Sequence, residues 1–104
     1  MLNDAVIEEV GRRILRAAPL GSRLILFGSH VRGDAGEHSD LDFLVIEPSV
    51  ADWGRESVRL HRTLKGLGVF ADIVVVSEES VREWGDVYGT VIHAALGEGR
   101  ELAA

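Results

Sequence analysis

Two short groups of residues have the types and spacing needed to bind a triphosphate. Gly28 and Ser29 follow an apolar run at residues 24–27, and Asp40 and Asp42 follow after a gap of ten residues. A glycine after a strand permits a sharp turn whose backbone N–H groups can approach an anion. A serine hydroxyl can donate to a phosphate oxygen. Gly28 and Ser29 therefore predict a phosphate-binding turn.

Asp40 and Asp42 stand at the start of a second apolar run, and Asp72 stands at the start of a third. Side chains two residues apart on a strand face the same side, with their backbones about 7 Å apart. Mg²⁺ prefers such oxygen ligands and shares them with substrate phosphates. If the third strand lies beside the second, Asp72 joins the other two acids. Two cations would then offset the repulsion among the carboxylates and clamp the attacking and leaving oxygens of a phosphoryl or nucleotidyl transfer.

Hydrophobic periodicity and capping residues predict the elements that position these groups. The predicted strands cover residues 23–27, 41–46 and 71–76, and a helical turn over 29–33 follows the first of them. The first helix covers residues 4–17 and is capped by Asn3, and a second is capped by Ser49 or Asp52 and reaches about residue 67. A short helix capped by Ser77 ends at Gly85, and a last helix over about 87–96 precedes a short tail. This order predicts an α/β fold, with helices packed on a small sheet.

Composition limits the classes of function. The 104 residues fit a single domain, 1–104, and the chain has no cysteine, which excludes disulfides and thiolate sites. A net charge of −6 argues against direct nucleic-acid binding, although a metal ion can still mediate nucleotide binding. The apolar runs are too short to cross a membrane and the start is unlike a signal peptide, so a soluble cytoplasmic protein is expected.

The combined pattern resembles a known family over nearly the whole chain. Phe27-Gly28-Ser29, Arg32-Gly33-Asp34 and Ser39-Asp40-Leu41-Asp42, followed by Asp72, are similar to the motifs of the minimal nucleotidyltransferases of the DNA polymerase beta-like nucleotidyltransferase superfamily. The resemblance implies a mixed β-sheet flanked by helices, with ATP as substrate.

The resemblance also implies a role for each motif residue. Asp40 and Asp42 would hold two Mg²⁺ ions, and Asp72 would hold the catalytic metal and help to activate the acceptor hydroxyl. All three acids would be catalytic. The residues that would contact the nucleotide are Gly28, Ser29, Arg32 and Ser39.

Minimal members of this family often act as MntA-type antitoxins in HEPN/MNT modules, and some transfer AMP from ATP to a tyrosine of the HEPN-domain toxin. The resemblance therefore implies a protein adenylyltransferase, with a toxin partner or a second copy supplying the acceptor surface. Two alternatives stay open: a non-catalytic antitoxin or interaction module, and a nucleotidyltransferase acting on a small molecule or an RNA end.

The roles of several side chains stay open at this level. His30 stands where the family more often has a basic or aromatic residue, and His38 lies in the loop before the acids. Arg32 suits a surface ion pair as well as a phosphate contact. Trp53 and Trp84 are expected to be packing residues or partner anchors.

Overall fold

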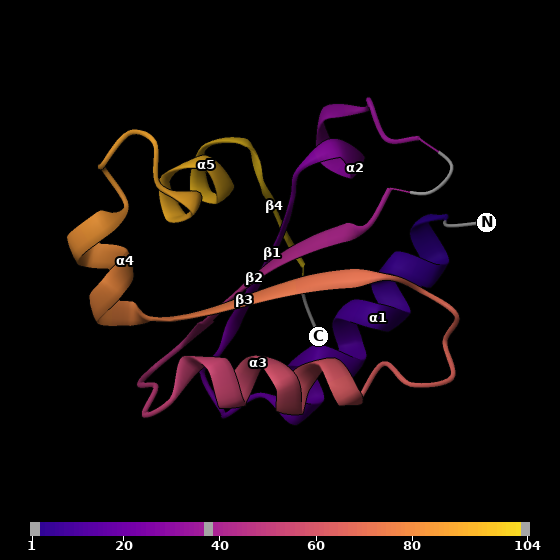
Figure 1. Ribbon diagram of the computed structural model, residues 1–104, viewed down its shortest axis with the longest axis horizontal. Helices are drawn as coiled ribbons and strands as arrows, with labels where there is room; N and C mark the ends of the chain where they lie inside the picture. The colour runs from indigo at the N-terminus through magenta and orange to yellow at the C-terminus, as the bar shows by residue number, and fades with distance from the viewer. Residues whose placement is uncertain (1–2, 37–38, 103–104) are drawn as a thin grey trace.

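The computed structural model describes residues 3–36 and 39–102 and contains a sheet flanked by helices (Figure 1). The helices are α1 (Asp4–Ala17), α2 (Ser29–Arg32), α3 (Trp53–Arg62), α4 (Glu78–Trp84) and α5 (Val91–Glu98). The strands are β1 (Arg23–Phe27), β2 (Leu41–Glu47), β3 (Ala71–Ser77) and β4 (Arg100–Leu102). The predicted α/β class is confirmed.

The four strands form one sheet in the order β3-β2-β1-β4. β2 pairs with β3 in parallel, whereas β1 runs antiparallel to both β2 and β4. The sheet is therefore mixed, as the resemblance implied. The predicted neighbourhood of the second and third strands is also confirmed.

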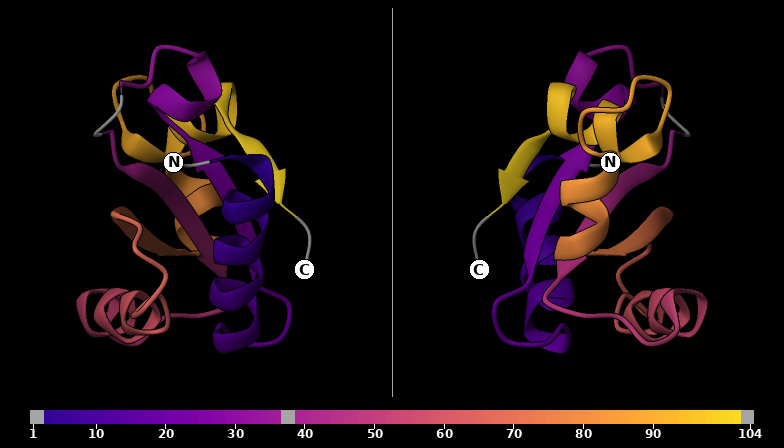
Figure 2. Two further views of the ribbon diagram at one scale, coloured as in Figure 1. Left: turned by 90° about the vertical axis from the view of Figure 1, so that its right-hand side faces the viewer. Right: turned by 90° about the vertical axis from the view of Figure 1, so that its left-hand side faces the viewer.

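Helices cover both faces of the sheet. α1 and α3 lie on one face and α4 and α5 lie on the other, so β2 runs through the middle of the molecule (Figures 1 and 2). Alternate residues of β2 enter two apolar cores: Leu41, Phe43 and Val45 face α1 and α3, while Leu44 and Ile46 face the other layer. Burial on both faces explains why β2 reads as a continuous apolar run after its acidic start.

The helix starts follow the local capping signals. Asn3 Oδ1 accepts a hydrogen bond from Val6 N at 2.9 Å, and Asp52 Oδ1 accepts one from Arg55 N at 3.0 Å. Ser77 Oγ accepts one from Ser80 N at 3.0 Å. The predicted caps Asn3 and Ser77 are confirmed, and Asp52 rather than Ser49 caps α3.

Three predicted boundaries were wrong. α3 ends at Arg62, and the chain continues to Leu67 through turns closed by hydrogen bonds between residues three apart. α5 begins at Val91 instead of residue 87, because Gly89 has a φ of 91° and Thr90 caps the helix. The predicted tail forms β4, a strand too short to show an alternating pattern in the sequence.

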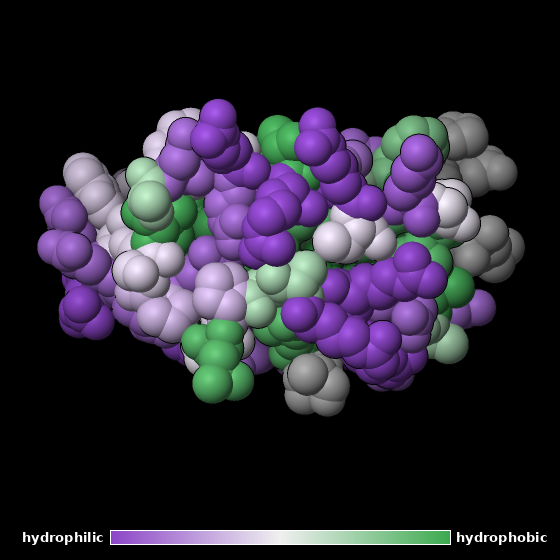
Figure 3. All heavy atoms as spheres, turned by 90° about the horizontal axis from the view of Figure 1, so that it is seen from below, coloured by the Kyte–Doolittle hydropathy of each residue, from purple (hydrophilic) through white to green (hydrophobic). Residues whose placement is uncertain are grey.

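The underside of the molecule, seen in Figure 3, is largely hydrophilic with scattered hydrophobic side chains. α1 and α3 each carry ion pairs between residues three apart, with Arg12–Glu9 at 2.9 Å and Arg59–Glu56 at 2.7 Å. Such pairs suit helix faces in contact with water. None of the described helices is long and apolar enough to span a bilayer.

Candidate active site

Gly28 forms the turn that follows β1. Its φ of 81° and ψ of −155° lie in a region that is open essentially only to glycine. A Cβ at this position would also collide with Oδ2 of Asp42, so the turn backbone lies directly against that carboxylate. The sharp turn expected from the sequence is therefore present, and it touches the second motif.

Asp42 and Asp72 face each other across neighbouring strands. They are paired residues in the parallel register of β2 and β3, where adjacent strands lie about 4.8 Å apart. Paired residues project to the same face of a sheet, which brings both carboxylates to one place. Asp42 is half-buried and Asp72 is exposed. Asp40 is also exposed and lies one residue before β2.

The acids influence one another electrostatically. Burial raises the pKa of the Asp42 carboxyl group, and the negative charges of Asp72 and Asp40 raise it further. His30 and Arg32 act in the opposite direction. The ionised form of Asp42 is thus disfavoured by its acidic neighbours, and a cation bound between them would reverse that effect.

The acids do not form a complete metal cage. Across residues 3–36 and 39–102, no three acidic or imidazole side chains are grouped closely enough to hold a metal ion. The centre of the site is therefore the pair Asp42 and Asp72, with Asp40 at its edge. Carboxylate oxygens remain the donor type that suits Mg²⁺, which usually takes one or two protein carboxylates together with substrate phosphates and water.

Arg32 and the turn meet a carboxylate from the C-terminal end of α5. Oε1 of Glu98 accepts hydrogen bonds from Gly28 N at 3.0 Å and from Arg32 Nη1 at 3.1 Å. Arg32 Nε also donates to Asp34 Oδ2 at 3.3 Å. The Arg32 side chain is about half exposed, so its guanidinium group remains open on one side.

The loop before Asp40 is held to α2. His30 Nε2 lies 3.1 Å from the carbonyl oxygen of Ser39, and Ser39 Oγ accepts a hydrogen bond from Gly36 N at 2.8 Å. These contacts fix the backbone immediately before the acids. His30 therefore has a positional role, although no role is assigned to it from the sequence. His38 lies outside the described residues.

A cleft of about 730 Å³ opens over the acidic pair. Asp42 and Asp72 lie in it, and its other walls come from both sides of the sheet edge. The cleft is lined by Phe27, Ser57, Val58, His61, Arg62, Ala71, Ile73, Val74 and Val91 together with the two acids. An apolar wall with basic side chains beside two carboxylates suits an acceptor group held near a nucleotide.

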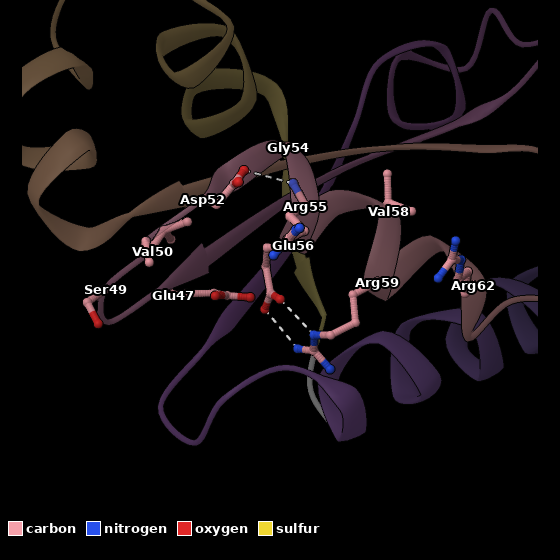
Figure 4. Close-up of a pocket in the computed structure, with 11 residues that line it drawn as sticks. Glu47, Ser49, Val50, Asp52, Gly54, Arg55, Glu56, Val58, Arg59 and Arg62 are labelled. Carbon is pink, nitrogen blue, oxygen red and sulfur yellow. Dashed lines mark hydrogen bonds and ion pairs between the residues drawn. The ribbon is translucent and has the colours of Figure 1, made fainter.

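A second hollow, of about 820 Å³, lies at the opposite end of β2 and contains none of the motif acids (Figure 4). Glu47 borders it, and its exposed fraction is only 2%. In Figure 4 its carboxyl group points toward Glu56, which Arg59 binds at 2.7 Å. Burial and the adjacent Glu56 raise the pKa of Glu47 to about 8, whereas the hydrogen bond from Arg59 lowers the pKa of Glu56 to about 2. We interpret this hollow as a feature of the structural scaffold and not as a functional site.

Glu47→Gln is expected to remove a pH dependence of stability. Between pH 4.5 and 8, folded Glu47 keeps a proton that the unfolded chain releases, so the free energy of unfolding falls as pH rises. The slope from this group is at most about 1.4 kcal/mol per pH unit. Urea unfolding from pH 5 to pH 8 should show Glu47→Gln gaining stability relative to wild type. Glu101→Gln, at an exposed pair with Arg23, is the control. Parallel pH curves for wild type and Glu47→Gln would contradict the assignment.

The sequence did not point to every residue at the site. Glu98 was assigned to a tail region, and its contact with Gly28 spans 70 residues of chain. His61 and Arg62 belong to no recognisable sequence motif. They line the cleft because α3 packs beside β3. A single charged residue far along the chain gives no local signal of such a contact.

Comparisons with known proteins identify the family and the fold. The sequence profile described as "Nucleotidyltransferase domain" matches residues 7–102. No curated protein matches the chain. Among solved structures, a mutant of the toxin–antitoxin MntA-HpeT is 18% identical, with a TM-score of 0.64, over 99% of this chain and 74% of that chain.

Two other structures are also similar. A toxin–antitoxin solved with AMP-PNP is 20% identical, with a TM-score of 0.55, and the match covers 99% of this chain and 74% of that one. A proposed nucleotidyltransferase from Sulfolobus solfataricus is 21% identical, with a TM-score of 0.57, over 76% of this chain and 70% of that one. At these identities the likenesses show the fold.

Proposed function

Because the chain belongs to the nucleotidyltransferase domain family, we propose that it transfers AMP from ATP to a hydroxyl group of a protein partner in a Mg²⁺-dependent reaction. The observation that carries this proposal is the pairing of Asp42 with Asp72 beside the Gly28 turn. A triphosphate held by that turn would lie next to both carboxylates. Transfer at such a site depends mainly on positioning and charge stabilisation, which a small scaffold can supply.

Each side chain has a defined part in this proposal. Asp42 and Asp72, with Asp40 at the edge, would hold the metal. Mg²⁺ bound there would neutralise the charge that develops on the phosphates and on the attacking oxygen. Gly28 N and the Arg32 guanidinium are donors directed at an anion, as their contacts with Glu98 demonstrate. Glu98 would have to leave these two donors before a triphosphate could bind them.

The acceptor is proposed to be a HEPN-domain toxin. Two similar structures are toxin–antitoxin proteins, and one of them was solved with AMP-PNP. The cleft walls beside the acids include Val58, 51% exposed, and Val91, 43% exposed, which are surfaces that a partner protein can cover. The partner would present its hydroxyl near Asp72, which lies on the edge strand β3.

A non-catalytic antitoxin is the second candidate. Large apolar side chains are exposed around α4 and α5, including Trp84 at 45% and Tyr88 at 91%. Such residues are frequent anchors in protein interfaces. This function needs no nucleotide, so calorimetry with ATP and Mg²⁺ separates the two candidates.

The proposed reaction predicts transfer of label to a partner. We expect purified protein, Mg²⁺ and ATP labelled at the α-phosphate to label the product of the neighbouring gene, with release of pyrophosphate. ATP labelled at the γ-phosphate should leave the partner unlabelled, because only the nucleoside monophosphate is transferred. Label from the γ-phosphate on the partner, or no label from either nucleotide, would contradict the proposed reaction.

A further inference from the structure

We propose that Glu98 is an internal anion that occupies the phosphate-binding donors in the nucleotide-free protein and must rotate away before a triphosphate binds. This inference rests on the proposed function, since it assigns Gly28 and Arg32 to the triphosphate. Glu98 thereby keeps the turn and Arg32 in place while it limits the affinity of the site for nucleotide. It is a positioning residue that also competes with the substrate.

The contacts of Glu98 have the pattern expected of a bound phosphate oxygen. One carboxylate oxygen, Oε1, accepts from Gly28 N at 3.0 Å and from Arg32 Nη1 at 3.1 Å. The second, Oε2, lies 3.3 Å from the same Arg32 nitrogen. A backbone N–H and a guanidinium group meeting on one anionic oxygen is a charge-assisted arrangement that phosphates also use. The donors cannot serve Glu98 and a triphosphate in the same way at once.

The backbone beneath Glu98 is fixed. Gly99 packs so tightly on β1 that a Cβ there would collide with Ile25 Cγ2 and with the carbonyl oxygen of Ala95. Arg100 follows directly in β4 and pairs with Leu26. The α5–β4 junction therefore cannot move away from the turn without breaking the sheet. Release of the donors requires only rotation of the Glu98 side chain, which is 30% exposed and has solvent beside it.

Arg32 has a second carboxylate partner besides Glu98. Hydrogen bonds to Glu98 and to Asp34 both raise the pKa of Arg32, with the larger effect from Glu98, so Arg32 keeps one carboxylate partner after Glu98 leaves. A triphosphate brings several anionic oxygens to the same donors, whereas Glu98 brings one carboxylate. The Glu98 carboxylate therefore keeps Gly28 and Arg32 in place when no nucleotide is bound, and a triphosphate can still replace it.

Removing the carboxylate is expected to tighten nucleotide binding. Calorimetric titration of the full chain with AMP-PNP and Mg²⁺ should give about tenfold higher affinity for Glu98→Ala than for wild type, because a charge-assisted contact no longer has to be broken. Glu98→Gln keeps the side-chain oxygen and loses the charge, so it should fall between the two. Glu101→Gln, which removes one exposed negative charge three residues away, should bind as wild type does.

Equal or weaker binding by both Glu98 variants would overturn the inference. Weaker binding would mean that Glu98 supports the nucleotide directly. Thermal unfolding of each variant shows whether the fold is retained, and the isosteric Glu98→Gln keeps the test valid if Glu98→Ala unfolds.

A titration with tripolyphosphate, followed at the Gly28 amide resonance, separates this inference from the proposed function. If AMP-PNP binds to no variant but tripolyphosphate binds more tightly to Glu98→Ala, the internal anion is supported and the nucleotide proposal fails. If AMP-PNP binds and both ligands show no change in affinity across the Glu98 variants, the proposed function survives and the internal anion is rejected. Absence of binding of both ligands to every variant also rejects it.

Discussion

Asp42→Asn is expected to reduce nucleotidyl transfer by about a thousandfold or more while leaving the protein at least as stable as wild type. Asp42 lies where the Gly28 turn meets β3, so in the proposed site its charge would be the one most directly shared between triphosphate and metal. The amide keeps the shape of the carboxylate but cannot bind a hard cation with a full charge. If Asp42 is a metal ligand as proposed, its loss would remove stabilisation of the charge that develops in the transition state.

The stability half of this prediction follows from the pKa of Asp42. Burial and the charges of Asp72 and Asp40 raise that pKa, so ionised Asp42 is a cost to the folded state in the absence of metal. A neutral asparagine removes this repulsion. Initial rates of partner labelling and urea unfolding without Mg²⁺ measure the two effects. Asp86→Asn, at an exposed acid in the turn after α4, is the control and should change neither.

A result in which Asp42→Asn lost transfer and stability together would mean that Asp42 is mainly structural. Full transfer by the variant would remove Asp42 from the proposed metal site. Asp72→Asn should reproduce the loss of transfer, because the two carboxylates share one register position.

Gly28→Ala is expected to lower transfer by about a hundredfold and the free energy of unfolding by at least about 1–3 kcal/mol. The new methyl group enters a backbone conformation with φ of 81° and ψ of −155°, which alanine strongly disfavours. It also meets Oδ2 of Asp42, so either the turn or the carboxylate must shift. In the proposed site, a small displacement of either group would misplace the phosphates relative to the acids, so we expect the effect on rate to exceed the effect of strain alone.

Gly33→Ala provides a matched control for Gly28→Ala. Gly33 has nearly the same φ, 84°, but a Cβ there would meet no atom within 4 Å. We expect this variant to lose about 1–2 kcal/mol of stability and to keep most of its transfer activity. Partner labelling and thermal unfolding of both variants make the comparison. Equal losses of activity would show that backbone strain, rather than contact with Asp42, explains the effect.

Much of the fold was predictable because its signals are local. The helix at Asp4–Ala17 has a capping asparagine, an apolar stripe and a following proline, and it forms as predicted. The strand at Arg23–Phe27 likewise matches its apolar run. Glycine at position 28 indicated a sharp turn, and the structure shows why no larger residue fits there. Each signal depends on residues within a few positions of one another.

The candidate acids could be identified from the sequence, but their arrangement in space could not. Their placement depended on which strands are neighbours, and the parallel pairing of β2 with β3 supplied that information. Their roles as metal ligands, and those of Gly28, Ser29, Arg32 and Ser39 as nucleotide contacts, stay predictions.

By itself the sequence determined the class of fold, the caps Asn3 and Ser77, the first three strands and the family, because these depend on residue spacing and short-range chemistry. Only the tertiary structure decided that residues Arg100–Leu102 form a strand against β1, that Glu98 reaches the Gly28 turn, and that Glu47 is buried beside Glu56. These contacts join segments far apart in the chain. Their free energy comes from packing and charge in three dimensions, which the order of neighbouring residues does not encode.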